Sequence, residues 1–167
     1  MVQRQQDRTF MGLITMVTTK VIEINHKLKL SGHLTVKDQD GNVLVDTHNQ
    51  ITKAGVRQLI AGNGCKKITY LALGRGTSAE SQEDVKLEKE YSRYLISNIQ
   101  ITNGIAIITV DITDNLTTKI DEFGLFMNNG NFDASAADSG ILFSRVVASL
   151  QRLYKQMLLI EWRISLT

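Results

Sequence analysis

The stretch Tyr91–Ile112, YSRYLISNIQITNGIAIITVDI, decides the fold of this 167-residue chain. Two runs rich in β-branched and aromatic residues, Tyr91–Ile101 and Ile105–Ile112, flank the dipeptide Asn103-Gly104. Asn-Gly favours a two-residue hairpin turn, because both residues tolerate the positive φ that this turn requires. The stretch therefore predicts two antiparallel strands joined by a tight turn, and it favours a sheet built from such pairs.

Other segments share this extended character, being rich in β-branched residues or alternating between apolar and polar ones. They are Leu28–Val36, Asn42–Thr47, Ile68–Leu73, Ile141–Ala148 and Leu158–Leu166, and the turn Asp38–Gly41 joins the first two as a hairpin. The segments Ser78–Glu90 and Asn128–Gly140 are predicted to be a solvated loop and a mobile loop.

One short helix interrupts the strands. Thr52 offers an N-cap hydroxyl to the segment 53–61, whose apolar residues recur at near-helical spacing before Gly62 stops it. We therefore predict a mainly β fold, an antiparallel β-sandwich or barrel-like domain with seven or eight strands and one short helix.

The composition is that of a globular domain, with 43% hydrophobic and 22% charged residues. A net charge of +2 does not predict a nucleic-acid partner, and a single cysteine excludes an internal disulfide. We predict one β-rich domain over residues 26–167, preceded by an N-terminal arm over residues 1–25.

The arm carries a short apolar run, Phe10–Val17. Asp7 interrupts the charged region before this run and no small-residue cleavage site follows it, so it is not typical of a signal sequence. Eight residues also cannot span a bilayer. We expect these apolar side chains to insert into an adjacent subunit: Phe10, Met11, Leu13, Ile14, Met16 and Val17.

Asp121 and Glu122 are the first candidates for acid-base chemistry. Adjacent residues of a strand point to opposite faces, so the two carboxylates are not expected to act jointly. Each face of the segment also mixes polar and apolar residues. Either Gly124 marks a bulge that switches the faces, or an acid is buried with a partner. We expect Glu122 to be tied to backbone amides or a basic group, with Phe123 or Phe126 in the core.

The remaining candidates predict no catalytic, cofactor or metal site. Gly74-Arg75-Gly76 lacks the third glycine, the lysine and the helix of a phosphate-binding loop, and a turn explains it. His26, His33 and His48, with Asp46, lack the spacing of a zinc site.

Cys65 has Lys66 and Lys67 beside it, which would lower the pKa of its thiol, but a small buried apolar residue is the commoner role. Four tyrosines, with Trp162, fit a carbohydrate-stacking set or ordinary strand packing: Tyr70, Tyr91, Tyr94 and Tyr154. These candidates leave the prediction that the chain is not an enzyme and takes no small-molecule substrate.

Read in order, several short motifs resemble a recurrent domain of tailed-bacteriophage virions. They are NQITKAGVRQLIAG, ITYLALGRGT, EYSRYLISNIQITNGIAIITVDI, IDEFGLF, ILFSRVV and LLIEWRISL, which together cover roughly Asn49 to Thr167. The chain is similar to the N-terminal domain of tail-collar fibre proteins and to short phage structural proteins of the same pattern. The matching positions are Thr52–Gly62, Gly74–Thr77 and Glu122–Phe126, and the resemblance implies structural roles for Gly74, Gly76, Glu122, Gly124, Leu125 and Phe126. Residues 1–48 fall outside the pattern.

The resemblance implies a structural component of a tailed phage particle, a baseplate, tail or neck adaptor or a small fibre-attachment protein. Its partners would be other virion proteins and further copies of itself in cyclic symmetry, with no nucleic acid and no membrane. Its location would be the virion, assembled in the host cytoplasm. The alternatives are a capsid decoration protein or head fibre, then a carbohydrate-binding module, and then an enzyme with a site scattered over several loops.

Overall fold

The computed structural model describes residues 30–128 and 136–166. Within them the chain forms nine strands, one α-helix and one short 3-10 helix. In chain order these are β1 (Leu30–Asp38), β2 (Val43–Ile51), α1 (Lys53–Ile60), η1 (Cys65–Lys67), β3 (Ile68–Gly74), β4 (Glu90–Leu95), β5 (Asn98–Thr102), β6 (Ile105–Ile112), β7 (Thr118–Met127), β8 (Ile141–Arg152) and β9 (Leu158–Leu166).

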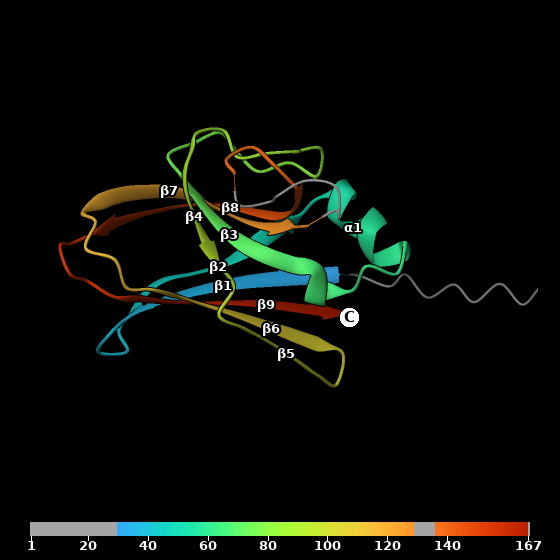
Figure 1. The fold of residues 1–167 in the computed structure, drawn as a ribbon, viewed down its shortest axis with the longest axis horizontal. Helices are drawn as coiled ribbons and strands as arrows, with labels where there is room; N and C mark the ends of the chain where they lie inside the picture. The colour runs from blue at the N-terminus through green and yellow to red at the C-terminus, as the bar shows by residue number, and fades with distance from the viewer. Residues whose placement is uncertain (1–29, 129–135, 167) are drawn as a thin grey trace, which may run out of the picture.

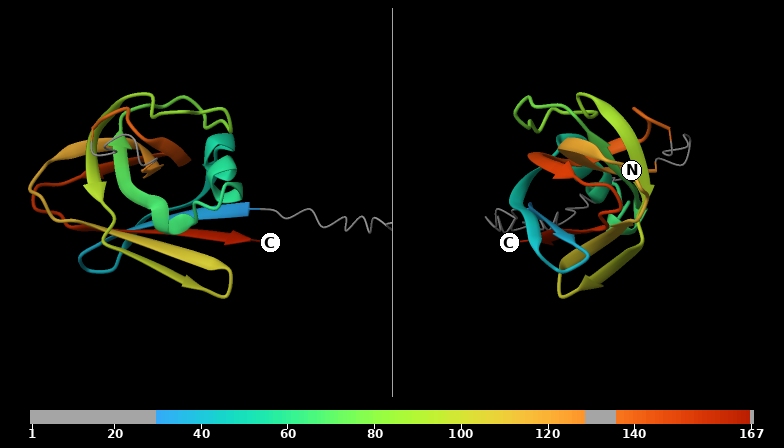
Figure 2. Two further views of the ribbon diagram at one scale, coloured as in Figure 1. Left: turned by 45° about the vertical axis from the view of Figure 1, so that its right-hand side comes forward. Right: turned by 90° about the vertical axis from the view of Figure 1, so that its left-hand side faces the viewer.

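The strands form one antiparallel sheet in the order β4-β3-β7-β8-β2-β1-β9-β6-β5, curled into a half-barrel (Figures 1 and 2). The mainly β, barrel-like prediction is confirmed, with nine strands in place of seven or eight. Consecutive strands β4 and β5 lie at the two opposite edges of the sheet. The Ile96 N–H donates to Thr69 O (3.0 Å) and the Ser97 N–H donates to Thr109 O (2.8 Å). The connection between β4 and β5 thus ties the two edges together.

This connection corrects the prediction of one continuous strand over Tyr91–Ile101. The chain must leave the β3 edge and reach the β6 edge, so the strand breaks at Ile96 and Ser97. The tight turn that follows β5 is confirmed: Asn103 and Gly104 have φ of 51° and 75°.

The first hairpin and the helix are also confirmed. Gly41 turns the chain between β1 and β2 with φ of 83°. Thr52 caps α1, since its Oγ1 accepts the Gly55 N–H at 3.0 Å and donates to Leu142 O at 2.6 Å. The helix therefore begins against β8, and Gly62, with φ of 85°, follows its end.

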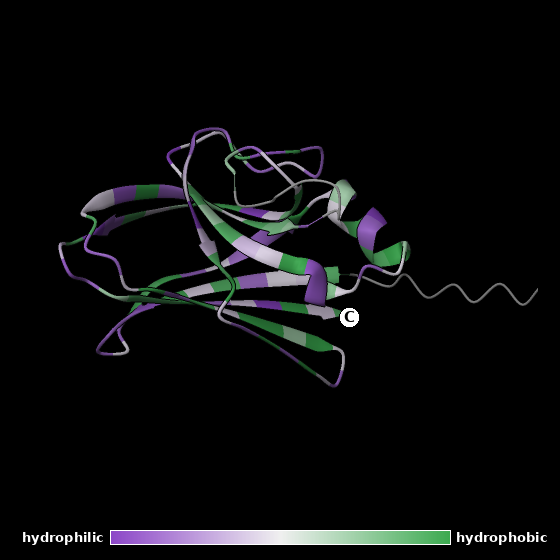
Figure 3. Cartoon of the chain, viewed as in Figure 1, coloured by the Kyte–Doolittle hydropathy of each residue, from purple (hydrophilic) through white to green (hydrophobic). Residues whose placement is uncertain are grey.

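The main core lies inside the half-barrel. Along β9 the buried residues are Leu158, Ile160, Trp162 and Ile164, which confirms the predicted period-two strand. Opposite β9, β7 contributes Phe123, Leu125 and Met127 to the same core. Figure 3 shows hydrophobic and hydrophilic residues alternating along several of these strands.

β7 is buried on both faces. Its outer face carries Phe126, which forms a second small cluster with Ala72, Leu142 and Leu87. Leu87 belongs to the connection between β3 and β4 and is 1% exposed. The predicted loop Ser78–Glu90 is largely exposed, as expected, but Leu87 is buried and the segment packs over the sheet as a second layer.

Candidate functional site

The conspicuous polar feature of the described residues is a carboxylate buried between the sheet and this second layer. Glu122 on β7 is fully buried. Its Oε1 accepts the N–H of Gly76 at 2.8 Å and of Lys89 at 2.7 Å. Its Oε2 accepts the N–H of Glu88 at 3.0 Å. One side chain thus holds both ends of the connection between β3 and β4, and the prediction that Glu122 is tied to amides or a base is confirmed.

Arg145 on β8 completes this arrangement from the neighbouring strand. Its Nε and Nη2 lie 3.1 Å and 3.0 Å from Glu122 Oε2, and its Nη1 lies 3.0 Å from Asp84 Oδ2. Burial of the guanidinium would lower its pKa, but the hydrogen bonds to Asp84 and Glu122 outweigh it and raise the pKa of Arg145. We call Glu122, Arg145 and the amides of Gly76, Glu88 and Lys89 the carboxylate clamp.

The carboxylate clamp explains why residues 74 and 76 are glycines. Neither Gly74 nor Gly76 has positive φ, so the expected turn is not what requires them. A Cβ built on either glycine would overlap the Glu122 carboxylate. The pairing of β3 with β4 shifts register between Leu73 and Gly74 and then continues, with the Arg75 N–H donating to Lys89 O at 2.9 Å. Glycine lets the carboxylate approach the backbone closely.

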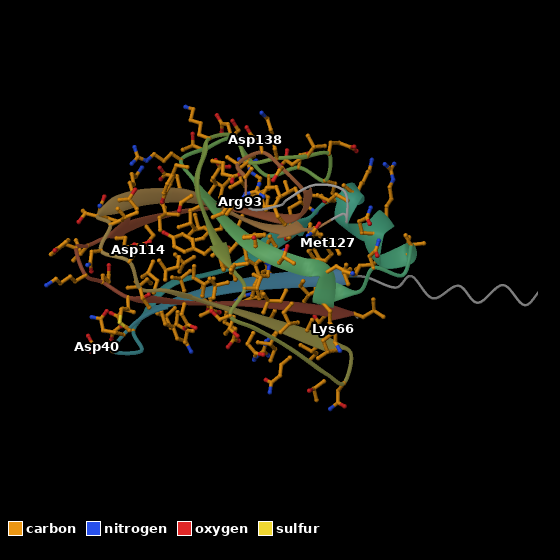
Figure 4. The ribbon with its side chains drawn as sticks, in the orientation of Figure 1. Asp40, Lys66, Arg93, Asp114, Met127 and Asp138 are labelled. Carbon is orange, nitrogen blue, oxygen red and sulfur yellow. The ribbon has the colours of Figure 1, made fainter. Side chains whose placement is uncertain are left out.

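The other three family-like positions follow Glu122 along β7 and pack on its two faces. A Cβ on Gly124 would lie 2.8 Å from Leu87, so glycine makes room for the covering segment. Leu125 faces the main core, and Phe126 lies under the guanidinium of Arg93, 4.0 Å from its ring centroid. Arg93 also donates to Ser139 O at 2.9 Å, and Figure 4 shows it on the side of the molecule that carries Asp138. The positions that the resemblance singled out thus lie side by side.

Asp121 and Glu122 face different surroundings and share no partner among the described residues. Ile120 and Phe123 both face the main core, so the alternation of β7 switches at the register shift between Ile120 and Glu122. Asp121 contacts Ser149 and Lys119, which are not partners of Glu122. Both explanations offered for the mixed faces therefore hold, but the switch lies before Gly124 and not at it.

The Glu122 carboxylate is buried and its oxygens accept four donors, so its hydrogen bonds hold the covering segment against the sheet. The clamp fixes a segment that the rest of the molecule also holds. Glu80 Oε1 accepts the Val147 N–H at 2.6 Å, and Gln82 O accepts the Lys53 N–H at 2.8 Å. The connection between β3 and β4 is thus anchored to β7, β8 and α1.

The end of the half-barrel away from α1 exposes apolar side chains. The connections 113–117 and 153–157 lie side by side there, because Ile112 pairs with Leu158 and Thr118 with Arg152 (Figure 1). Arg152 binds Asp114 and donates to Gln156 O at 2.9 Å, which holds the two connections together. The exposed apolar residues at this end are Leu116, Leu153, Tyr154 and Met157, between 48% and 64% exposed. Such a group is suited to protein contact.

The histidines lie at the surface of the first hairpin. His33 and His48 are cross-strand partners with ring centroids 5.0 Å apart, and His33 Nε2 binds Asp46 Oδ1. This bond lowers the pKa of Asp46. Within residues 30–128 and 136–166 no three histidine, cysteine or acidic side chains come together as metal ligands. His26 lies outside the described residues.

Cys65 is half-buried against the main core, and burial raises the pKa of its thiol. The interpretation of a lowered thiol pKa is therefore wrong, and the apolar packing role holds. A lysine neighbour in sequence does not activate a thiol that the fold removes from water.

The aromatic residues do not form one stacking platform. Trp162 is fully buried, so it cannot serve as one. Tyr94 donates to Asp114 Oδ2 at 2.5 Å, Tyr91 lies by Arg75 near β4, and Tyr154 lies in the connection after β8. Strand packing and local hydrogen bonds account for them.

Several residues of this arrangement escaped the sequence analysis. Arg145 stands in the middle of the apolar strand sequence ILFSRVVA, and a charge inside a buried strand signals a buried partner. Asp84, Glu88 and Leu87 gave no local signal, because only the fold brings them over β7. The proposed inter-subunit residues of the arm, Phe10–Val17, and the domain boundary at 26 lie outside the described residues.

Comparison with protein-family models finds no match, and neither do comparisons with curated proteins and with solved structures. Among the described residues, no helix is long and apolar enough to cross a bilayer.

Proposed function

We propose that the protein is a structural component of a tailed phage particle, an adaptor of the baseplate, tail or neck or a small fibre-attachment protein, that works through protein contacts. The observation that carries this proposal is the meeting of the family-like positions at one structural feature. Gly74 and Gly76 lie in one segment and Glu122 in another, yet both glycines make room for the Glu122 carboxylate and Gly76 donates its N–H to it. A resemblance that rests on short motifs in order gains support when the motifs serve one purpose.

The character of the clamp fits assembly better than catalysis. Glu122, the acid of the family-like set, is buried and binds backbone amides and an arginine, so its role is to hold a surface segment in place. The apolar residues at the far end, with Tyr154 and Leu153 more than half exposed, add a surface suited to a partner. The partners of such a protein are other virion proteins and further copies of this chain in cyclic symmetry.

The test is to purify particles of the phage that encodes this chain on a density gradient and to identify their proteins by mass spectrometry. The chain should be found in the particles at a fixed copy number. A truncated form lacking residues 1–20 should remain folded, by its circular dichroism, and should stay outside the particles. Absence of the full-length chain from purified particles would contradict the proposal, and entry of the truncated form would contradict the role of the arm.

A further inference from the structure

The sheet divides between β2 and β8. β2 pairs with β1 along most of its length but with β8 only at Gln50 and Ile51. At this junction the Thr52 N–H donates to Phe143 O at 3.0 Å and Ser144 Oγ donates to Gln50 O at 2.8 Å. Because backbone groups of alternate residues point to the same side of a strand, the N–H and C=O groups of residues 46, 48 and 50 face away from β1, as far as the register shift at Leu44.

Beyond the junction, a side chain takes the place of the missing pairing. The Val147 N–H, which continued pairing would direct to β2, donates instead to Glu80 Oε1. Glu80 thus ends the ladder from the β8 side. On β2 no described strand pairs with the outward groups of Asp46 and His48. The His48 carbonyl has only a long contact of 3.4 Å with Thr47 Oγ1.

Farther along the two strands, two residues of the core are slightly exposed. Val45 on β2 and Leu150 on β8, at 9% and 8% exposed, are the two most exposed members of the main core cluster of the described residues. Both belong to the parts of the strands that have separated. A hollow of about 530 Å³ lies at the junction, lined by residues of β1, β2, α1 and the covering segment, among them Gln50, Ile51, Val56 and Gln82.

We propose that the edge of β2 around Asp46 and His48 receives the segment Phe10–Val17 of a second copy of this chain as an added strand. Unpaired N–H and C=O groups along a strand edge bind an extended peptide through main-chain hydrogen bonds. Alternate apolar side chains of that peptide would cover Val45 and Leu150. The segment is uncharged, contains no proline and is apolar at Ile14 and Met16, which share one face of a strand.

The chain outside the described sheet is long enough for this contact. Residues 18–29 lie between the segment and β1 and span at most about 40 Å when extended. We choose a second copy because the arm and the β2 edge are different surfaces, and head-to-tail contacts between different surfaces form a ring when the rotation between copies closes. The inference rests on the proposed function in treating the arm as an inter-subunit element.

The first test uses full-length Asp46→Pro, with Asp46→Ala as its matched control. The Asp46 N–H faces the free edge and not β1, so proline removes only an edge donor and is tolerated there, as on other edge strands. Both variants lose the contact with His33. In analytical ultracentrifugation at tens of micromolar, wild type and Asp46→Ala should be oligomeric, and Asp46→Pro should shift to monomer. A monomeric wild type, or assembly of Asp46→Pro equal to that of Asp46→Ala, would overturn the proposal.

The second test identifies the occupant. Met16 is replaced by the photoreactive residue benzoylphenylalanine, and ¹⁴N-labelled and ¹⁵N-labelled proteins are mixed before irradiation. Cross-linked peptides should join position 16 of one label to residues 43–51 of the other. Cross-links confined to one label would show that the chain's own arm fills the edge, and cross-links elsewhere would show a different acceptor, so either result overturns the proposal. Both tests use purified protein, so their failure is distinct from absence of the chain from phage particles.

Discussion

Replacing Glu122 by Gln tests the carboxylate clamp with almost no change in shape. The amide can still accept the N–H groups of Gly76 and Lys89 through its oxygen. The NH₂ group of Gln replaces Oε2, which accepted hydrogen bonds from the Glu88 N–H and the Arg145 guanidinium. An NH₂ group is a donor, so it cannot accept either bond. Arg145, at 3% exposed, would also lose its buried counter-ion and keep only the partly exposed Asp84 and, at 4.0 Å, Glu88.

Removing one partner of a buried ion pair costs about 3–5 kcal/mol. We expect the low end here, about 3 kcal/mol, because Asp84 still binds Arg145. For a chain of this size that corresponds to a fall of about 10 °C in the midpoint of thermal unfolding. The measurement is urea unfolding at pH 7 followed by circular dichroism, together with a thermal scan.

The neighbouring acid supplies the control. Asp121→Asn keeps the bond from Ser149 and loses only an ion pair with Lys119, whose side chain is 56% exposed, so it should cost less than about 1 kcal/mol. Combining Glu122→Gln with Arg145→Met removes the unpaired charge, so the double variant should lose less stability than the sum of the two single variants. Equal unfolding free energies for Glu122→Gln and wild type would refute the clamp as the anchor of the second layer.

Three further predictions use other parts of the fold. Gly74→Ala places a Cβ on the Glu122 carboxylate and should destabilise the protein by about 2 kcal/mol or more in urea, whereas Gly64→Ala meets open space and should be nearly neutral. Burial opposes ionisation of Asp114, but hydrogen bonds from Tyr94 and Arg152 outweigh it and hold its pKa below 3.8. Its contribution to stability is therefore complete above pH 3.8 and disappears as the pH falls through the lower folded-state pKa, so thermal scans of Asp114→Asn should show a smaller loss of stability on acidification than wild type. Cys65, whose thiol pKa burial raises, should react with iodoacetamide at pH 7 more slowly than free cysteine, and an equal rate would contradict its position against the core.

The sequence predicted the elements whose causes are local. The hairpin turn at Asn103-Gly104 follows from residues that tolerate positive φ, and the helix after Thr52 follows from its capping hydroxyl. The alternation of β9 follows from one buried face. Each of these patterns is complete within about ten residues, so no knowledge of distant contacts is needed.

The features that the sequence did not predict depend on contacts between residues that are far apart in the chain. The break at Ile96 and Ser97 arises because β4 and β5 belong to opposite edges of the sheet, and nothing in the run of β-forming residues marks it. The polar segment Ser78–Glu90 looks solvated, but Leu87 is buried and the carboxylates of Glu80 and Asp84 bind β8. The glycines of GRG were predicted to form a turn, whereas they make room for a carboxylate from a distant strand.

The most direct test of the central claim is electron cryo-microscopy of purified particles of the phage that encodes this chain. We predict density for the nine-stranded half-barrel, repeated in a ring at the baseplate, tail or neck, with the connection between β3 and β4 folded over β7. A reconstruction in which every protein of the tail and neck is assigned and none has this fold would contradict the account.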